Sequence, residues 1–240
     1  MAETIRNDLA IYDQVAARWW DESIPWVRTL RSMVPGRFRL FDPIMAAEGG
    51  WTGRDVLDLG CAGGFMTEAL AERGARATGI DPAAHAIDAA RAHAQSSGLS
   101  IRYDVGVGEA LPYADASFDA VVCVDVLEHV ADLAAVLAEA ARVLRPGGMF
   151  LFDTINRNPL AAFAVVTMAE NVLGLLPKGA HDPALFIRPS ELRVRLAAAG
   201  FAPGRITGFG PQWIDLKGRL RFGALPLTAI IYLGSARKTG

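Results

Sequence analysis

The amino-acid sequence predicts an α/β fold in which helices cover both faces of one seven-stranded, mostly parallel sheet. Two observations carry this prediction. From Arg54 onward, short β-rich runs alternate with longer helical segments, and the run 120–124 is apolar throughout. Strands and helices that alternate in this way form parallel sheets with right-handed crossovers. A continuous apolar run is typical of a central parallel strand that is buried on both faces.

Strands are expected at seven runs, namely 55–59, 75–80, 101–105, 120–124, 149–153, 203–209 and 226–236. Apolar residues at helical spacing predict helices through residue 73 and over 82–97, 131–144 and 189–199. Arg145-Pro146-Gly147-Gly148 ends the helix that precedes the fifth strand, because proline and glycine there interrupt a helix and form a turn.

Two further segments complete the expected single domain, 1–240. Helical spacing over 7–20 and 26–48 predicts an N-terminal helical cap, and the strongly apolar segment 159–176 predicts a helical insertion after the fifth strand. The domain then divides into the cap over 1–50, a ligand-binding core over 51–155, the insertion over 156–190 and the C-terminal part of the sheet over 191–240.

Composition excludes several classes of protein. Hydrophobic residues make up 52% of the chain and charged residues 21%, which excludes disorder. A net charge of -2 and a pI of about 6.1 give no basic face for nucleic acid. Cys61 and Cys123 form no spaced pair, and the polar N-terminus lacks the apolar core of a signal peptide. A cytoplasmic protein is therefore expected.

A glycine-rich loop follows the first predicted strand. It reads Asp58-Leu59-Gly60-Cys61-Ala62-Gly63-Gly64, and Asp81 follows the second strand, 21 residues beyond Gly60. Glycines at such a place allow a tight turn and a close approach of backbone to ligand, and the distal acid can accept hydrogen bonds from ribose hydroxyls. The arrangement predicts a cofactor that contains a nucleoside.

The loop favours S-adenosylmethionine over a dinucleotide. A dinucleotide fingerprint requires glycines at positions 60, 62 and 65, where the chain has Gly60, Ala62 and Phe65. Asp58, before the first glycine, suits an ammonium or sulfonium better than a pyrophosphate. The loop resembles motif I of class I methyltransferases, whose fold is Rossmann-like, with Ala62 in place of the middle glycine.

Three later stretches, 108–112, 117–119 and 144–148, resemble the same class in the same order. The resemblance assigns Asp81 to the ribose and Glu109 to the adenine region. The full set expected to bind S-adenosylmethionine is Arg39, Asp58, Gly60, Cys61, Ala62, Gly64, Asp81, Pro82, Gly108, Glu109 and Val124.

Nearly the whole chain resembles the O-methyltransferases of ubiquinone biosynthesis, which methylate a catechol-like hydroxyl on a polyprenylated ring. The matching pieces are 17–21, 125–130, 154–158, 177–182 and 186–189. That family carries an arginine, in a His-Arg-x-Asn-Pro-x-Arg stretch, that resembles a ligand for the methionine carboxylate. The chain diverges there, and Arg39 is the better candidate by its distance to the glycine loop, with Arg37 as the alternative.

A Glu-x-x-Glu-His motif of that family resembles a divalent-cation site, and here it becomes Asp125, Glu128 and His129. Residues at i, i+3 and i+4 share a face if the turn is helical, and this donor set suits Mg²⁺ or another divalent cation. A cation would stabilise the attacking phenolate. Alternatively, His129 acts alone as general base. Glu128 and His129 are the expected catalytic residues.

The insertion 159–176 has two interpretations. Thr167, Glu170 and Asn171 form one narrow polar stripe on an otherwise apolar helix, and the longest run without a charge, 159–169, is too short to span a bilayer. The segment is either a lid over the active site or a peripheral membrane contact that admits a lipid-soluble acceptor.

The sequence thus predicts an S-adenosylmethionine-dependent O-methyltransferase of a quinol-like or catechol-like small aromatic molecule, with Mg²⁺ as the candidate metal and no nucleic-acid partner. Two alternatives stay open. One is a relative that methylates carbon or nitrogen of another small molecule, and the other is a cofactor-binding, membrane-peripheral scaffold without turnover.

Overall fold

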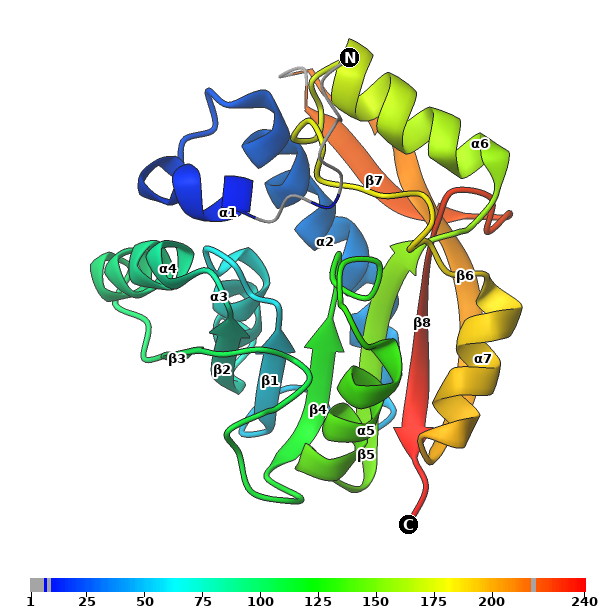
Figure 1. The fold of residues 1–240 in the computed structure, drawn as a ribbon. Coiled ribbons are helices and arrows are strands. Elements are labelled where there is room, and N and C mark those ends of the chain that lie inside the picture. The colour runs from blue at the N-terminus through cyan, green and yellow to red at the C-terminus, as the bar shows by residue number, and fades with distance from the viewer. Residues whose placement is uncertain (1–6, 8–9, 217–218) are drawn as a thin grey trace.

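Eight strands form one mixed sheet in the computed structural model, which describes residue 7, residues 10–216 and residues 219–240 (Figure 1). The order is β3-β2-β1-β4-β5-β8-β6-β7. The first five strands in this order are parallel, and β8, β6 and β7 each pair antiparallel with their neighbours. The strands are β1 (Asp55–Leu59), β2 (Arg76–Asp81), β3 (Arg102–Val105), β4 (Phe118–Cys123), β5 (Leu144–Ile155), β6 (Phe201–Ile214), β7 (Leu220–Leu225) and β8 (Ile231–Lys238).

The expectation of seven strands is wrong, because the run predicted at 226–236 covers only part of β8 and the separate strand β7 precedes it. β7 pairs with β6 as a hairpin. Arg219 and Arg221 form ion pairs with Oδ2 of Asp215 at 3.0 and 2.7 Å. The sequence did contain a signal for it. Leu220 and Phe222 alternate with arginines, which is the two-residue period of a strand with one solvated face.

Helices pack on both faces of the sheet, as predicted. One face carries α2 (Pro25–Ala46) and α3 (Phe65–Ala71), and the other carries α5 (Leu133–Val143) and α7 (Pro189–Ala198). Neighbouring residues of the central strands alternate between these two cores: Phe150 and Phe152 of β5 pack with α5 and α7, and Leu151 packs with α2 and α3. The helix α4 (Ala84–Ser96) packs on β2 and β3.

The N-terminal cap is less regular than expected. It comprises α1 (Ala10–Gln14), the 3₁₀ turn η1 (Ala16–Arg18) and α2, and residues 8 and 9 of the predicted helix 7–20 lie outside the described residues. Asp13 fixes α1 to the start of α4, since its carboxylate accepts from the His85 backbone N–H at 2.9 Å and contacts His85 Nδ1 at 2.6 Å.

The insertion is one helix with two geometries. It starts as α6 (Pro159–Ala162), where the Asn158 side chain accepts from the Ala161 N–H at 2.9 Å, and continues as the π-helix η2 (Phe163–Val172). It therefore ends a few residues earlier than predicted. Within the described part of the chain, no helix is both long and apolar enough to cross a membrane.

We expect Phe152→Ala to lower the free energy of unfolding by about 3–5 kcal/mol, because it leaves a cavity in the fully buried core of β5. Phe163→Ala, on a side chain that is 55% exposed, is the matched control and should change it by less than about 0.5 kcal/mol. Urea denaturation measures both. Equal losses would contradict the assigned packing.

Candidate active site

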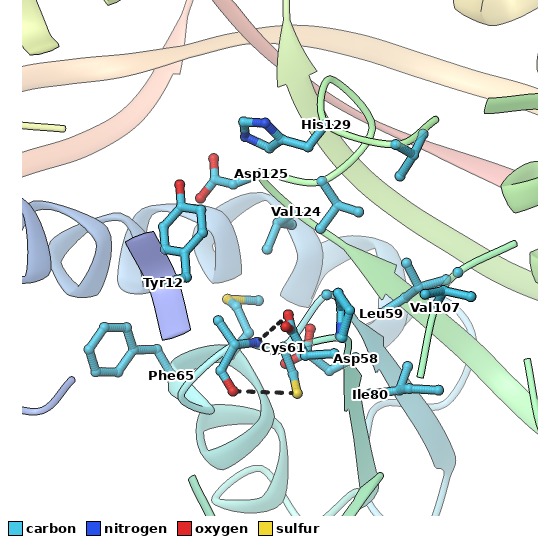
Figure 2. A pocket seen from close by; sticks show the side chains of 18 of the residues that line it. Tyr12, Asp58, Leu59, Cys61, Phe65, Ile80, Val107, Val124, Asp125 and His129 are labelled. Carbon is cyan, nitrogen blue, oxygen red and sulfur yellow. Dashed lines mark hydrogen bonds between the residues drawn. The ribbon is translucent and has the colours of Figure 1, made fainter. Parts of the chain in front are cut away.

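A cavity of about 350 Å³ lies at the carboxyl ends of β1, β2 and β4, partly enclosed by the N-terminal cap (Figure 2). Open α/β sheets bind their ligands at this edge. Figure 2 shows Asp58 and Cys61 toward one end of the cavity and Asp125 and His129 toward the other. Apolar side chains line much of the remaining wall, among them Leu30, Val34, Leu59, Phe65, Met66, Ile80, Val107 and Val124.

Most of the residues predicted to bind the cofactor line this cavity, namely Asp58, Gly60, Cys61, Ala62, Asp81, Pro82, Gly108, Glu109 and Val124. Gly64 is instead required by the turn. It is the N-cap of α3 with φ +92°, and a Cβ there would lie 2.5 Å from the Tyr103 hydroxyl. Glu109 also accepts the backbone N–H of Ala131 at 3.2 Å, so its carboxylate links two loops of the cavity wall.

The glycine loop turns sharply over the end of β1. Gly60 has φ +78°, and a Cβ there would lie 2.2 Å from a methyl carbon of Val126. Ala62, which replaces the middle glycine, has φ +43°, and a non-glycine residue adopts this region at a cost of roughly 1–2 kcal/mol. Asp81 stabilises this loop conformation, since its carboxylate accepts from the Ala62 N–H at 2.9 Å and from the Ala83 N–H at 2.9 Å.

Asp58 is a cavity-lining residue with a buried carboxylate. Its Oδ2 accepts from the Thr67 hydroxyl at 2.5 Å, and no described residue hydrogen-bonds its Oδ1. Burial raises the pKa of Asp58 to about 7. An unsatisfied buried acceptor is costly, so this oxygen is suited to a cationic group of a ligand.

Arg37, rather than Arg39, is the arginine at the cavity. Arg37 lines the cavity and is 2% exposed, whereas Arg39 is not one of the lining residues and donates to the Phe222 carbonyl. The two side chains leave α2 in different directions because they are two residues apart on a helix. Pro35 and Arg37 keep the Pro-x-Arg spacing of the family stretch, and this signal could have distinguished the two arginines.

The predicted metal set is only partly brought together. Asp125 forms an ion pair with Arg37 at 2.5 Å, and Glu128 accepts from the Thr154 hydroxyl at 2.7 Å. Glu128 and His129 instead group with His181, and one ligand-type atom from each lies within 4.8 Å of the others. The Asp125 carboxylate is not part of this group, because Arg37 draws it toward α2.

Burial dominates the proton affinities at this end of the cavity. It raises the pKa of Glu128 to about 8, with a further contribution from the Asp125 carboxylate. It lowers the pKa of His129 to about 3, with a smaller contribution from His181. The His129 ring is therefore neutral at pH 7, and its buried Nε2 has no hydrogen-bond partner among the described residues.

Three residues near the site were not predicted as site residues. Tyr12 of α1 lines the cavity. Asn7 contacts His129 Nδ1 through its side-chain oxygen at 2.7 Å and donates to the His129 carbonyl at 3.1 Å. His181 lies far away in the sequence. Only the resemblance of 177–182 to a family stretch pointed to its region, since no spacing rule connects it to residue 129.

The two tryptophans of the family stretch at 17–21 hold the cap on the glycine loop. The Trp20 indole donates to the Gly63 carbonyl at 3.1 Å, and a Cβ on Gly63 would lie 1.9 Å from the Trp19 ring. Trp19 is 3% exposed and lines the cavity. The cap thus packs directly on the glycine loop.

A family of methyltransferase domains matches residues 57–152 of the chain. The ubiquinone biosynthesis O-methyltransferase of Stutzerimonas stutzeri is 41% identical over 210 residues, which cover 87% of this chain and 88% of that protein. The protein of the same name from Thiobacillus denitrificans is 40% identical over 211 residues, again covering 87% of this chain and 88% of its own.

Solved structures show the same fold. Magnesium protoporphyrin IX methyltransferase from Synechocystis, determined with bound SAH, superposes with a TM-score of 0.65 at 17% identity and covers 97% of this chain and 96% of that one. The α/β architecture with a mostly parallel sheet is therefore that of the Rossmann-like methyltransferases.

We expect Asp58 to make the ligand-free protein less stable as the pH rises from 4 to 7. The folded state keeps the Asp58 proton up to about pH 7, whereas the unfolded state loses it near pH 3.8, so this contribution to stability declines across that window. Between pH 5 and 7, wild type should lose about 2 kcal/mol more than Asp58→Asn, as measured by urea denaturation. Asp88→Asn, on an exposed carboxylate of α4, is the control, and between pH 5 and 7 its free energy of unfolding should fall by as much as that of wild type. Parallel curves for wild type and Asp58→Asn would contradict the assignment.

Proposed function

This chain belongs to the family of ubiquinone biosynthesis O-methyltransferases, and we propose that it transfers the methyl group of S-adenosylmethionine to a hydroxyl oxygen of a quinol or catechol. The observation that carries the proposal is that one cavity is lined both by the glycine loop and by the loop after β4, which contains His129. S-adenosylmethionine supplies a sulfonium methyl group. The acceptor oxygen would form the new bond to this carbon as the bond to sulfur breaks, S-adenosylhomocysteine would leave, and the hydroxyl proton would pass to water.

The residues at the glycine-loop end fit this cofactor. The Oδ1 atom of Asp58 is a buried acceptor that would receive the ammonium of the methionine part, and Asp81 would receive the ribose hydroxyls. Arg37 would face the methionine carboxylate, the role that the sequence-based expectation gave to Arg39. Cys61, Ala62 and the loop at Gly108 would supply backbone and apolar contacts.

His129 and its surroundings would orient the acceptor. The neutral His129 ring lines this part of the cavity, and the apolar wall at Val126 and Val130 suits an aromatic ring. A base with a pKa near 3 removes a phenolic proton poorly at neutral pH. This argues against His129 as the sole base and for a positive charge that lowers the proton affinity of the acceptor oxygen. Glu128 and His129 fit a divalent cation, whereas Asp125 is occupied by Arg37.

The chain would bind the surface of a membrane through exposed apolar side chains. Those on α6 and η2 are more than half exposed, and others lie on the β6–β7 hairpin and in the loop before β8. Figure 1 places α6 and β7 toward the same end of the molecule, the end to which β4 and β5 point. Apolar side chains gathered in this way are typical of membrane or protein contacts. The residues are Leu160, Phe163, Val172, Leu173, Trp213, Ile214, Leu216 and Leu227.

The function is tested by methyl transfer from labelled S-adenosylmethionine to plain and prenylated catechols and hydroquinones. We expect transfer to an oxygen of at least one of them. Asp81→Asn should weaken cofactor binding about 10–100-fold in equilibrium dialysis, because hydrogen bonds to a charged acceptor contribute about 1.5–3 kcal/mol. Asp88→Asn is the control. Cofactor binding without transfer to any ring would contradict the acceptor class, and unchanged binding by Asp81→Asn would contradict the ribose assignment.

Replacing Phe163 and Leu173 by serine should reduce binding to lipid vesicles about fivefold or more, since each exposed side chain loses roughly 1 kcal/mol of apolar burial. Co-sedimentation with phospholipid vesicles measures this. Val194→Ser, on a side chain of α7 that is 70% exposed, is the matched control. Equal partitioning of all variants would contradict the membrane contact.

A further inference from the structure

We propose that Glu128, His129 and His181 form a site for one divalent transition-metal ion, in which His181 takes the place that the sequence motif gave to Asp125. The inference deepens the proposed function and names the ion class and ligands of the same site. One ligand-type atom from each of the three residues lies within 4.8 Å of the others. Their side chains come from the loop after β4 and from the loop that follows η2, so the fold brings together residues that are distant in the sequence.

Hydrogen bonds fix the tautomers of both imidazole rings. His181 Nδ1 lies 2.6 Å from Glu170 Oε1, and a carboxylate can only accept, so the proton is on Nδ1 and the lone pair on Nε2. His129 Nδ1 lies 2.7 Å from the side-chain oxygen of Asn7, whose NH₂ group already donates to the His129 carbonyl. The amide oxygen therefore accepts from Nδ1, and the lone pair of His129 is also on Nε2.

Hydrogen bonds of this kind are typical of histidines that bind metal ions. Metal-binding histidines donate their second ring N–H to a carboxylate or an amide or carbonyl oxygen, which fixes the tautomer. His129 Nε2 is buried, and no described residue hydrogen-bonds it. As whole residues, Glu128, His129 and His181 are 1%, 8% and 6% exposed, and so they lie out of bulk water. An unpartnered buried lone pair beside a carboxylate and a second imidazole points to a bound cation.

Glu170 is the positioning residue of this site. Its carboxylate is 1% exposed and accepts from the backbone N–H groups of Gly179 and His181 at 3.0 and 3.1 Å, as well as contacting the His181 ring. One acidic side chain of η2 thus shapes the loop and aims the imidazole. This explains why the apolar segment 159–176 contains one acid, Glu170, which otherwise would be costly to bury.

The donor set also selects the class of ion. Two imidazoles and one carboxylate suit Mn²⁺, Fe²⁺, Co²⁺ or Zn²⁺, whereas Mg²⁺ prefers oxygen ligands and retains most of its water. Asp125 would have given a second carboxylate and favoured Mg²⁺, but its carboxylate is paired with Arg37 at 2.5 Å. The bound ion would place positive charge beside the part of the cavity that His129 lines.

Metal binding is measured on the metal-free full-length protein without any methyl acceptor, so its outcome is separate from that of the transfer assay. Titration with Mn²⁺ or Co²⁺ should show one ion per chain, and a large excess of Mg²⁺ should displace it poorly. Pulsed electron paramagnetic resonance of the Mn²⁺ form should show nitrogen couplings from two imidazoles. Absence of binding, or coupling to only one imidazole nitrogen, would overturn the proposal.

Variants distinguish the two ligand sets. His181→Gln should weaken Mn²⁺ binding about 100-fold or more, and Glu170→Gln about 10–100-fold, because outer-shell partners contribute on that scale. Asp125→Asn should weaken binding by less than about tenfold, and His85→Gln, on an exposed histidine of α4, is the control for histidine loss. Circular dichroism establishes whether each variant is folded. If a variant is not folded, the electron paramagnetic resonance spectrum of the wild-type Mn²⁺ form tests the ligand set instead. Loss of binding in Asp125→Asn with retention in His181→Gln would overturn the proposal.

Discussion

The buried contact of Arg37 with two carboxylates is the interaction on which the site depends. Arg37 donates to Asp153 at 2.6 Å and to Asp125 at 2.5 Å, and the second Asp153 oxygen accepts from the Asp125 N–H at 2.7 Å. Burial alone would lower the pKa of Arg37, but the two carboxylates raise it and keep the guanidinium charged. Helix α2 is thereby joined to the carboxyl ends of β4 and β5. Removing one partner from such a group leaves an uncompensated buried charge, at a cost of about 3–5 kcal/mol.

This contact separates the cavity into two ends with different chemistry. At the glycine-loop end, the proposed function gives Asp58 and Asp81 to the ammonium and the ribose of the cofactor. At the other end, Asp125 pairs with Arg37 of α2, and the residues that group with His129 are Glu128 and His181. The family assignment explains why one cavity needs both ends, because methyl transfer requires a donor and an acceptor held in line.

The sequence predicted what local patterns and motif spacing encode, and it failed where distant segments meet. The parallel core, the glycine loop and Asp81 follow from strand–helix alternation and from fixed spacing. Arg39 was preferred to Arg37 because distance along the chain does not say which face of α2 meets the cavity. β7 was missed because its alternation is short and lies next to a stronger apolar run. The contact of His181 with His129 joins segments 52 residues apart, and only the packing of the insertion brings them together.

The most direct test of this account is a double-mutant cycle on the free energy of unfolding, with Arg37→Met, Asp153→Leu and the double variant. We predict that each single change costs about 3–5 kcal/mol and that the double variant loses less than the sum by about 1.5 kcal/mol or more, because it removes both members of the buried pair. Losses that add to within about 0.5 kcal/mol would contradict the account, since Arg37 would then not be the link between the cap and the strand ends.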